Sequence, residues 1–269
     1  MKHVLPERET QVRKSKQVAC GFTRAVGLVV LVASAAPAQI VQEFKPPKAG
    51  CCLAAAAQNL ADQLQDWNQL GRYHEDNLRL RALPRDPGRI VFLGDSITDG
   101  WKLEQCFAGK PYVNRGISGQ TTAQMLVRMY PDVIRLEPAA LVILAGTSDI
   151  ARNTGPQTVE MIQDNIRAMT EIAQKHGIKV ILCSLTPVSD YTPRRQTERR
   201  PPPDILVLNG WLKRYAEENQ AGYVDYFTPL ADERGFLKEG HSNDGLHPNE
   251  RGYALMAPAV QAGIDKVIK

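Results

Sequence analysis

The sequence has no long apolar run, few cysteines and none of the common nucleotide-binding signatures. Its most apolar stretch, AVGLVVLVASAA, has only about 12 residues, whereas a helix that spans a bilayer needs ~20, which argues against a membrane anchor. Five cysteines in 269 residues are too few for a disulfide scaffold, and no CxxC motif occurs, so we assign the cysteines no redox or metal role. Neither GxGxxG nor GxxxxGKS/T is present, which argues against a nucleotide site.

The N-terminus has the organisation of a secretory signal peptide over residues 1–38. A basic, polar stretch precedes the apolar run, and the small residues APA at 36–38 form a candidate cleavage site. We therefore expect a secreted or periplasmic protein without a stable membrane anchor after cleavage. The segment holds six of the 33 basic and two of the 29 acidic residues, so the remaining chain has equal numbers of each. That balance gives no reason to expect nucleic acid as a partner.

The rest of the chain is expected to form a linker and one domain. Residues 39–50 contain the prolines and glycine of a linker. Residues 51–83 are rich in helix-forming residues, with apolar positions at Leu60, Leu64, Trp67 and 70–73, and predict an amphipathic entry helix that packs on the domain. The sequence PRDPG at 84–88 ends this helix. The domain is then expected to cover residues 51–269.

After residue 88, short apolar runs alternate with segments of helical period. Such runs are typical of strands that are buried on both faces, and alternation with helices predicts an α/β fold with a parallel five-stranded sheet and helices on both faces. The expected strands are 90–93, 112–114, 141–145, 179–184 and 223–226, and the main expected helices are 122–136, 158–176, 204–219 and 250–268.

Polar residues with catalytic potential follow several of these strands. In a parallel sheet, ligands bind at the carboxyl ends of the strands. Ser96 follows the first strand in GDS, and DGLH places Asp244 three residues before His247. Ser96 is a candidate nucleophile, His247 its base, and Asp244 the acid that orients the base. Asp95 is expected to serve its own turn. Gly116, after the second strand, is a candidate backbone donor to an oxyanion.

Other chemistry fits these residues less well. His241, Asp244 and His247 are spaced at three residues each and could ligate a metal, but no further acidic or histidine cluster completes a site. The GxSxG elbow of α/β-hydrolases is missing, because Thr98 stands at its second glycine. The long basic loop at 187–204 is either a solvated insertion or a flap over the site.

Four ordered blocks resemble those of the SGNH hydrolase superfamily, the GDSL-type esterases and lipases. They are GDSIT, NRGISGQTT, GTSD and DGLHPN, and the likeness runs from about residue 89 to the C-terminus. The surrounding sequence is most similar to the acetylhydrolase-like branch, which resembles platelet-activating-factor acetylhydrolase. The resemblance implies a flavodoxin-like three-layer α/β/α sandwich, and a serine esterase acting on short acyl groups such as acetyl in a small-molecule or glycan ester. It implies no metal or organic cofactor.

The same resemblance implies a triad of Ser96, His247 and Asp244, and an oxyanion hole that combines the N–H groups of Ser96 and Gly116 with a side chain of the third block. That side chain is an asparagine in the family, whereas this chain has Ser148. A hydroxyl also donates but has a shorter reach, and loss of one oxyanion donor costs roughly 10²–10³ in rate. We therefore expect a working but slower esterase. The alternative is a secreted carbohydrate-binding or interaction module on an inactive esterase fold.

Overall fold

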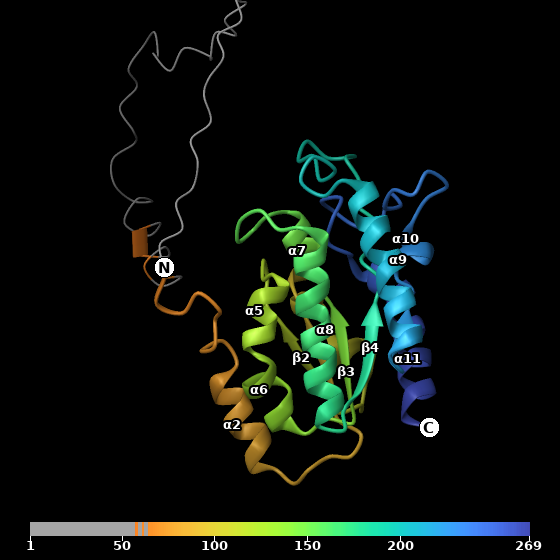
Figure 1. Cartoon of the computed structure of the whole chain (residues 1–269). Helices are drawn as coiled ribbons and strands as arrows, with labels where there is room; N and C mark the ends of the chain where they lie inside the picture. Colours follow the sequence, from red (N-terminus) through yellow and green to blue (C-terminus); the bar gives the residue numbers. More distant parts are fainter. Residues whose placement is uncertain (1–56, 59–60, 62–63) are drawn as a thin grey trace, which may run out of the picture. The chain divides into compact units, whose positions relative to one another are not determined.

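The computed structural model describes residues 57, 58, 61 and 64–269. The expected signal peptide and linker, together with Leu60, lie outside the described residues. Five strands form one parallel sheet in the order β2-β1-β3-β4-β5, which is the flavodoxin-like order (Figure 1). The predicted fold class is confirmed. The strands are β1 (Ile90–Gly94), β2 (Tyr112–Gly116), β3 (Ala140–Leu144), β4 (Lys179–Cys183) and β5 (Gly222–Val224).

Helices cover both faces of the sheet. α5 (Thr122–Val127), α8 (Val159–Lys175) and α9 (Pro202–Glu218) follow one another along one face, where α8 contacts both its neighbours, and α11 (Glu250–Ile268) packs on β3, β4 and β5 (Figure 1). Burial of β1 and β3 is complete along their length, which explains why their sequences are apolar without alternation. The shorter helices are α2 (His74–Ala82), α3 (Ser96–Asp99), α4 (Leu103–Cys106), α6 (Met129–Asp132), the 3-10 turn η1 (Ile134–Leu136), α7 (Thr147–Ile150) and α10 (Phe227–Leu230).

Two predicted helices differ from the structure. The one expected over 122–136 is divided into α5, α6 and η1, and Pro131, which has no N–H to bond the turn before it, lies within α6. The entry helix is interrupted before α2, because the Asp66 carboxylate accepts the N–H groups of Leu70 and Gly71 and holds a turn there. In the described part of this segment Leu64, Trp67 and Leu70 are exposed, and Leu80 in α2 packs half-buried against the core.

Glycines at the ends of β1 and β2 bring α3 directly onto the sheet. Gly94 and Gly116 are partners in the parallel register, so the two strands end at the same level. A Cβ at Gly94 would lie 2.1 Å from Thr98 Oγ1, and one at Gly116 would lie 2.1 Å from Asp99 N. β1 ends in Gly94 because α3 packs where a side chain at this position would be. The serine that begins α3 is thereby held at the carboxyl edge of the sheet.

Candidate active site

Three side chains from distant parts of the chain form a hydrogen-bonded series at this edge. Ser96 Oγ lies 2.8 Å from His247 Nε2, and His247 Nδ1 lies 2.7 Å from Asp244 Oδ2. Ser96 begins α3, whereas Asp244 and His247 lie in the loop between α10 and α11. The His247 side chain is 40% exposed, so a substrate can reach the serine–imidazole pair from solvent. The structure thus brings together the three residues predicted as a triad.

The loop that carries Asp244 is organised around its own side chains. Asp244 Oδ1 accepts the N–H groups of Leu246 and His247, so the carboxylate fixes both the ring and the backbone of the histidine. Burial opposes ionisation of Asp244, but the hydrogen bonds from the His247 backbone, the His247 ring and Leu246 outweigh it and lower the pKa of Asp244 to about 2. Asp244 is therefore a carboxylate at every pH at which the fold is expected to work.

The loop at 187–204 packs against the Asp244 loop. Gln196 Nε2 donates to the Asp244 carbonyl at 3.1 Å, and Ser189 N–H donates to the Gly245 carbonyl at 2.9 Å. Arg199 Nη2 donates to the carbonyl of Ala151, at the end of α7, at 3.1 Å. The loop is thus bound to its neighbours through its backbone and side chains. These contacts argue against a solvated insertion, which was one of the two interpretations of the sequence.

Gly116 does not offer the free N–H that the sequence analysis assigned to an oxyanion hole. Its N–H donates to Asn114 Oδ1 at 2.8 Å, and the residue is buried. The physical reason for glycine at this position is the close approach of α3 described above. The Gly116 prediction is therefore corrected: the donor is already used within the protein.

Gly119, three residues further on, has the properties that the sequence analysis sought at Gly116. It is exposed, its φ of +83° favours glycine, and among the described residues its N–H donates to no other group. Its carbonyl accepts from Asn153 Nδ2 at 2.9 Å, which joins it to the loop after α7. The sequence alone does not distinguish Gly119, because NRGISG contains two glycines and Gly116 is the one nearer to the strand.

Ser148 directs its hydroxyl away from solvent. Its Oγ lies 3.5 Å from Asp95 Oδ2, and the residue is 2% exposed. In this conformation the hydroxyl faces a buried carboxylate, so the structure does not bring Ser148 to an oxyanion hole as predicted.

Asp95, which was expected to serve its own turn, is the N-cap of α3 and accepts the Ile97 N–H at 3.0 Å. Burial raises the pKa of Asp95 to about 6; the Ile97 hydrogen bond opposes the rise, and the Asp149 carboxylate adds to it. A buried acid of this kind supports the turn that presents Ser96, and its charge depends on pH near neutrality.

The described residues contain no group of three or more histidine, cysteine or acidic side chains that could hold a metal ion. His247 uses Nδ1 for Asp244 and Nε2 for Ser96, so neither ring nitrogen is free for the His241–Asp244–His247 alternative.

No helix in the part of the chain that the structure describes combines the length and the hydrophobicity needed to cross a bilayer.

The sequence model of the GDSL-like lipase/acylhydrolase family matches residues 92–255, more than half of the chain. The chain belongs to this family. A GDSL-like lipase from Bacteroides thetaiotaomicron has a similar crystal structure, with a TM-score of 0.68 and 37% identity over 74% of this chain and 98% of that one. The family and this similar lipase, together with the esterases described next, make the chain a carboxylic ester hydrolase.

Two further relatives are esterases by name. Esterase TesA of Pseudomonas aeruginosa is 32% identical over 174 residues, which are 59% of this chain and 79% of TesA. An acetylxylan esterase of Xylanibacter ruminicola is 24% identical over 240 residues, covering 72% of this chain but only 48% of that larger protein.

Proposed function

We propose that this chain hydrolyses short-chain oxygen esters, acetyl esters above all, through an acyl-enzyme on Ser96. The observation that carries the proposal is the unbroken series from Ser96 Oγ through the His247 ring to Asp244 Oδ2. A serine hydroxyl is a weak nucleophile by itself, and an adjacent imidazole oriented by a carboxylate is the arrangement that activates it.

The proposed reaction has two halves. His247 Nε2 takes the Ser96 hydroxyl proton as Oγ attacks the ester carbonyl carbon, and the carbonyl oxygen becomes an oxyanion. The tetrahedral intermediate collapses, the C–O bond to the alcohol breaks, and His247 returns the proton to the leaving oxygen. Water then gives a proton to His247 and attacks the acyl-enzyme carbonyl. Ser96 leaves with that proton, and the products are the alcohol and the carboxylic acid.

The oxyanion is held by backbone donors in this proposal. Ser96 N–H lies at the N-terminus of α3, where no earlier helical carbonyl is available to it. Gly119 N–H is the second donor, in place of Gly116. Ser148 contributes no direct bond while its hydroxyl faces Asp95. With two oxyanion donors instead of three, turnover is expected to be slower by roughly 10²–10³ than in a site with three.

The acetyl preference and the location outside the cytoplasm belong to the same proposal. The similarity to an acetylxylan esterase supports an acetyl group on a glycan or small alcohol, although this chain spans less than half of that relative. The composition of residues 1–38 supports export, and N-terminal sequencing of the protein from its natural host should begin at Gln39.

Hydrolysis of p-nitrophenyl acetate by the purified chain and by Ser96→Ala tests the chemistry. We expect the substitution to lower kcat by on the order of 10³ or more. Cys106→Ser is the control, because Cys106 is an exposed thiol whose own reactivity must be excluded. Equal rates for Ser96→Ala and the unmodified chain would contradict the esterase mechanism and favour a binding module on the same fold. A series from acetate to decanoate esters tests the acyl preference.

A further inference from the structure

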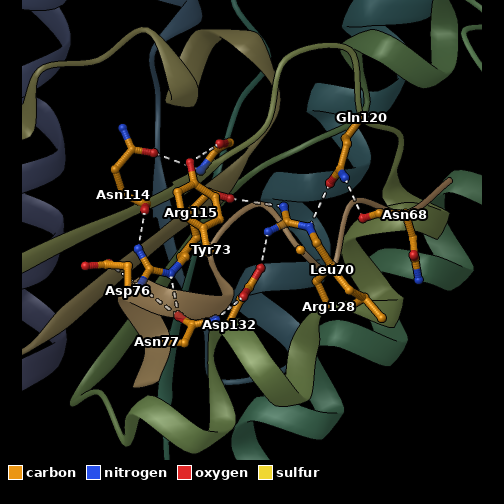
Figure 2. Close-up of polar contacts among 12 residues, drawn as sticks. Asn68, Leu70, Tyr73, Asp76, Asn77, Asn114, Arg115, Gln120, Arg128 and Asp132 are labelled. Carbon is orange, nitrogen blue, oxygen red and sulfur yellow. Dashed lines mark hydrogen bonds and ion pairs between the residues drawn. The ribbon is translucent and has the colours of Figure 1, made fainter. Parts of the chain in front are cut away.

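Residues 67–77 lie before the region matched by the family model, yet they contact the loop that follows β2. We call residues 67–77 the N-terminal clamp and residues 116–121 the β2–α5 loop. The clamp leads into α2, which Figure 1 shows beside α6, and the loop carries Gly119. The contacts between them are polar, and Figure 2 shows those that Tyr73 and Asn68 make.

The first contact is made by Tyr73. Its hydroxyl donates to the Gly116 carbonyl, on the peptide that begins the β2–α5 loop. Burial raises the pKa of the Tyr73 hydroxyl, and the nearby Asp99 carboxylate adds to the rise, so the group keeps its proton and remains a donor. Its ring also lies under the Arg115 guanidinium, 4.6 Å from the guanidinium carbon to the ring centre.

The second contact runs through Asp99. Arg72 Nη2 lies 3.3 Å from Asp99 Oδ1, while Asp99 Oδ2 accepts the Ser118 N–H at 3.0 Å and the Ser118 hydroxyl at 2.6 Å. Asp99 is the last residue of α3, the helix that Ser96 begins. The clamp therefore reaches Ser118, the residue before Gly119, through a carboxylate on the helix that Ser96 begins.

Backbone carbonyls of the clamp hold the far end of the loop. The Asn68 carbonyl accepts from Gln120 Nε2 at 2.8 Å. The Trp67 carbonyl accepts from the side chain of Gln124 in α5, whose Oε1 in turn accepts the N–H of Thr121 at the end of the loop. Gln120 in turn accepts from Arg128 Nε at 2.8 Å. The loop is thus bound at both ends, with Gly119 between the two sets of contacts.

Two buried arginines attach the clamp to the body of the domain. Arg115 donates to Asp76 Oδ2 at 2.7 Å and to Asn77 Oδ1 at 2.8 Å, and Arg128 donates to Asp132 and to the Arg115 carbonyl. Asn77 Nδ2 donates to Asp132 Oδ1 at 2.6 Å, which joins the two arginine sites into one network (Figure 2). Buried charges need such partners, so a displaced clamp would leave the Arg115 guanidinium underpaired.

We propose that the N-terminal clamp positions the β2–α5 loop for acyl transfer, with Tyr73 and Arg72 as positioning residues that hold Gly119 N–H toward the oxyanion. This inference rests on the proposed function for its effect on rate, but the clamp itself acts on backbone mobility. A hole that relies on two backbone donors depends strongly on the placement of each. The clamp therefore matters more in a chain whose third block has serine instead of asparagine.

Hydrogen exchange and kinetics on the full chain test this proposal together. In Tyr73→Phe and in Arg72→Gln, the amides of residues 116–120 should exchange several-fold faster, because each variant removes one anchor of the loop. For p-nitrophenyl acetate, kcat should fall by about tenfold while KM stays within twofold, as expected for a single lost hydrogen bond that acts on the transition state. Arg72→Lys should recover most of the Arg72→Gln loss.

Tyr130→Phe is the matched control, since the Tyr130 hydroxyl contacts His176 on the protein surface and no part of the clamp. If Tyr73→Phe lowers the melting temperature enough to obscure its kinetics, Arg72→Gln decides, because the Arg72 side chain is 52% exposed and unfolding is not expected. Unchanged exchange and an unchanged kcat in both variants overturn the clamp. An inactive unmodified chain would instead count against the esterase proposal, and the exchange rates would still test the clamp.

Discussion

Ser96 Oγ and His247 Nε2 lie 2.8 Å apart although 151 positions separate the two residues along the chain. The contact exists because β1 ends at the same edge of the sheet to which the loop before α11 returns. The histidine is held from the other side by Asp244 at 2.7 Å. This pair defines the proposed reaction, and its immediate surroundings give the predictions that follow.

Asp244→Asn should lower kcat by on the order of 10³–10⁴ with little change in KM. The amide can still accept from backbone N–H groups, but it no longer stabilises the imidazolium that forms during the reaction, and it favours the wrong ring tautomer. Steady-state kinetics on p-nitrophenyl acetate measure this. A loss smaller than tenfold would show that the carboxylate has only a structural role in its loop.

Activity should decline in acid with a limiting slope of one in the logarithm of kcat/KM against pH. Asp244, with a pKa of about 2, stays ionised, so a single proton taken by His247 removes the base. Asp95 titrates near pH 6 and requires a control. The acid limb should persist in Asp95→Asn; its disappearance there would assign the limb to Asp95 instead of His247.

Asp95→Asn should be more stable than the unmodified chain at pH 7, and this advantage should be smaller at pH 4. The folded pKa of Asp95 is about 6, above its ordinary value of 3.8, so the protonated form is favoured in the folded state. Stability from this group is complete below pH 3.8 and is lost as the pH rises through 6, by up to about 3 kcal/mol. Urea unfolding of both proteins at pH 4 and pH 7 should show the difference growing with pH; a constant difference would contradict it.

Ser148→Asn should raise turnover, whereas Ser148→Ala should leave it within about threefold of the unmodified chain. The serine hydroxyl faces Asp95, so its removal costs the oxyanion little, but an amide is longer and reaches further. A full additional donor is worth at most roughly 10²–10³ in kcat. Kinetics and melting temperature are measured together because the site is buried. A large loss in Ser148→Ala would show that the hydroxyl does stabilise the transition state.

Gly245→Ala should cost at least about 2 kcal/mol of stability and lower kcat. Gly245 has a φ of +79°, and a Cβ there would lie 2.2 Å from the Ser189 carbonyl oxygen, so the 187–204 loop and the Asp244 loop must separate. Gly109→Ala is the matched control: its φ is +74° but nothing lies within 4 Å, so only backbone strain of about 1 kcal/mol applies. Equal unfolding energies for the two variants would refute the packing between these loops.

The family, the sheet and the three residues of the Ser96–His247 series were accessible from the sequence. Buried strands such as 90–93 are read from local apolar runs, and helix 250–268 from its period, because both patterns depend on neighbours within a few positions. The helix expected at 122–136 was wrong in its continuity, since Pro131 and the contacts of α6 divide it. Packing in three dimensions overrode the local preference there.

The choice between Gly116 and Gly119 depended on the tertiary structure. Both glycines stand in one short block, and only the approach of α3 and the Asn114 side chain show that the first N–H is occupied. The direction of the Ser148 hydroxyl and the contacts of the N-terminal clamp with Arg115 likewise depended on the tertiary structure. Each depends on which buried donor meets which acceptor across long sequence separations, whereas residue type and spacing along the chain reveal only which groups are available to pair.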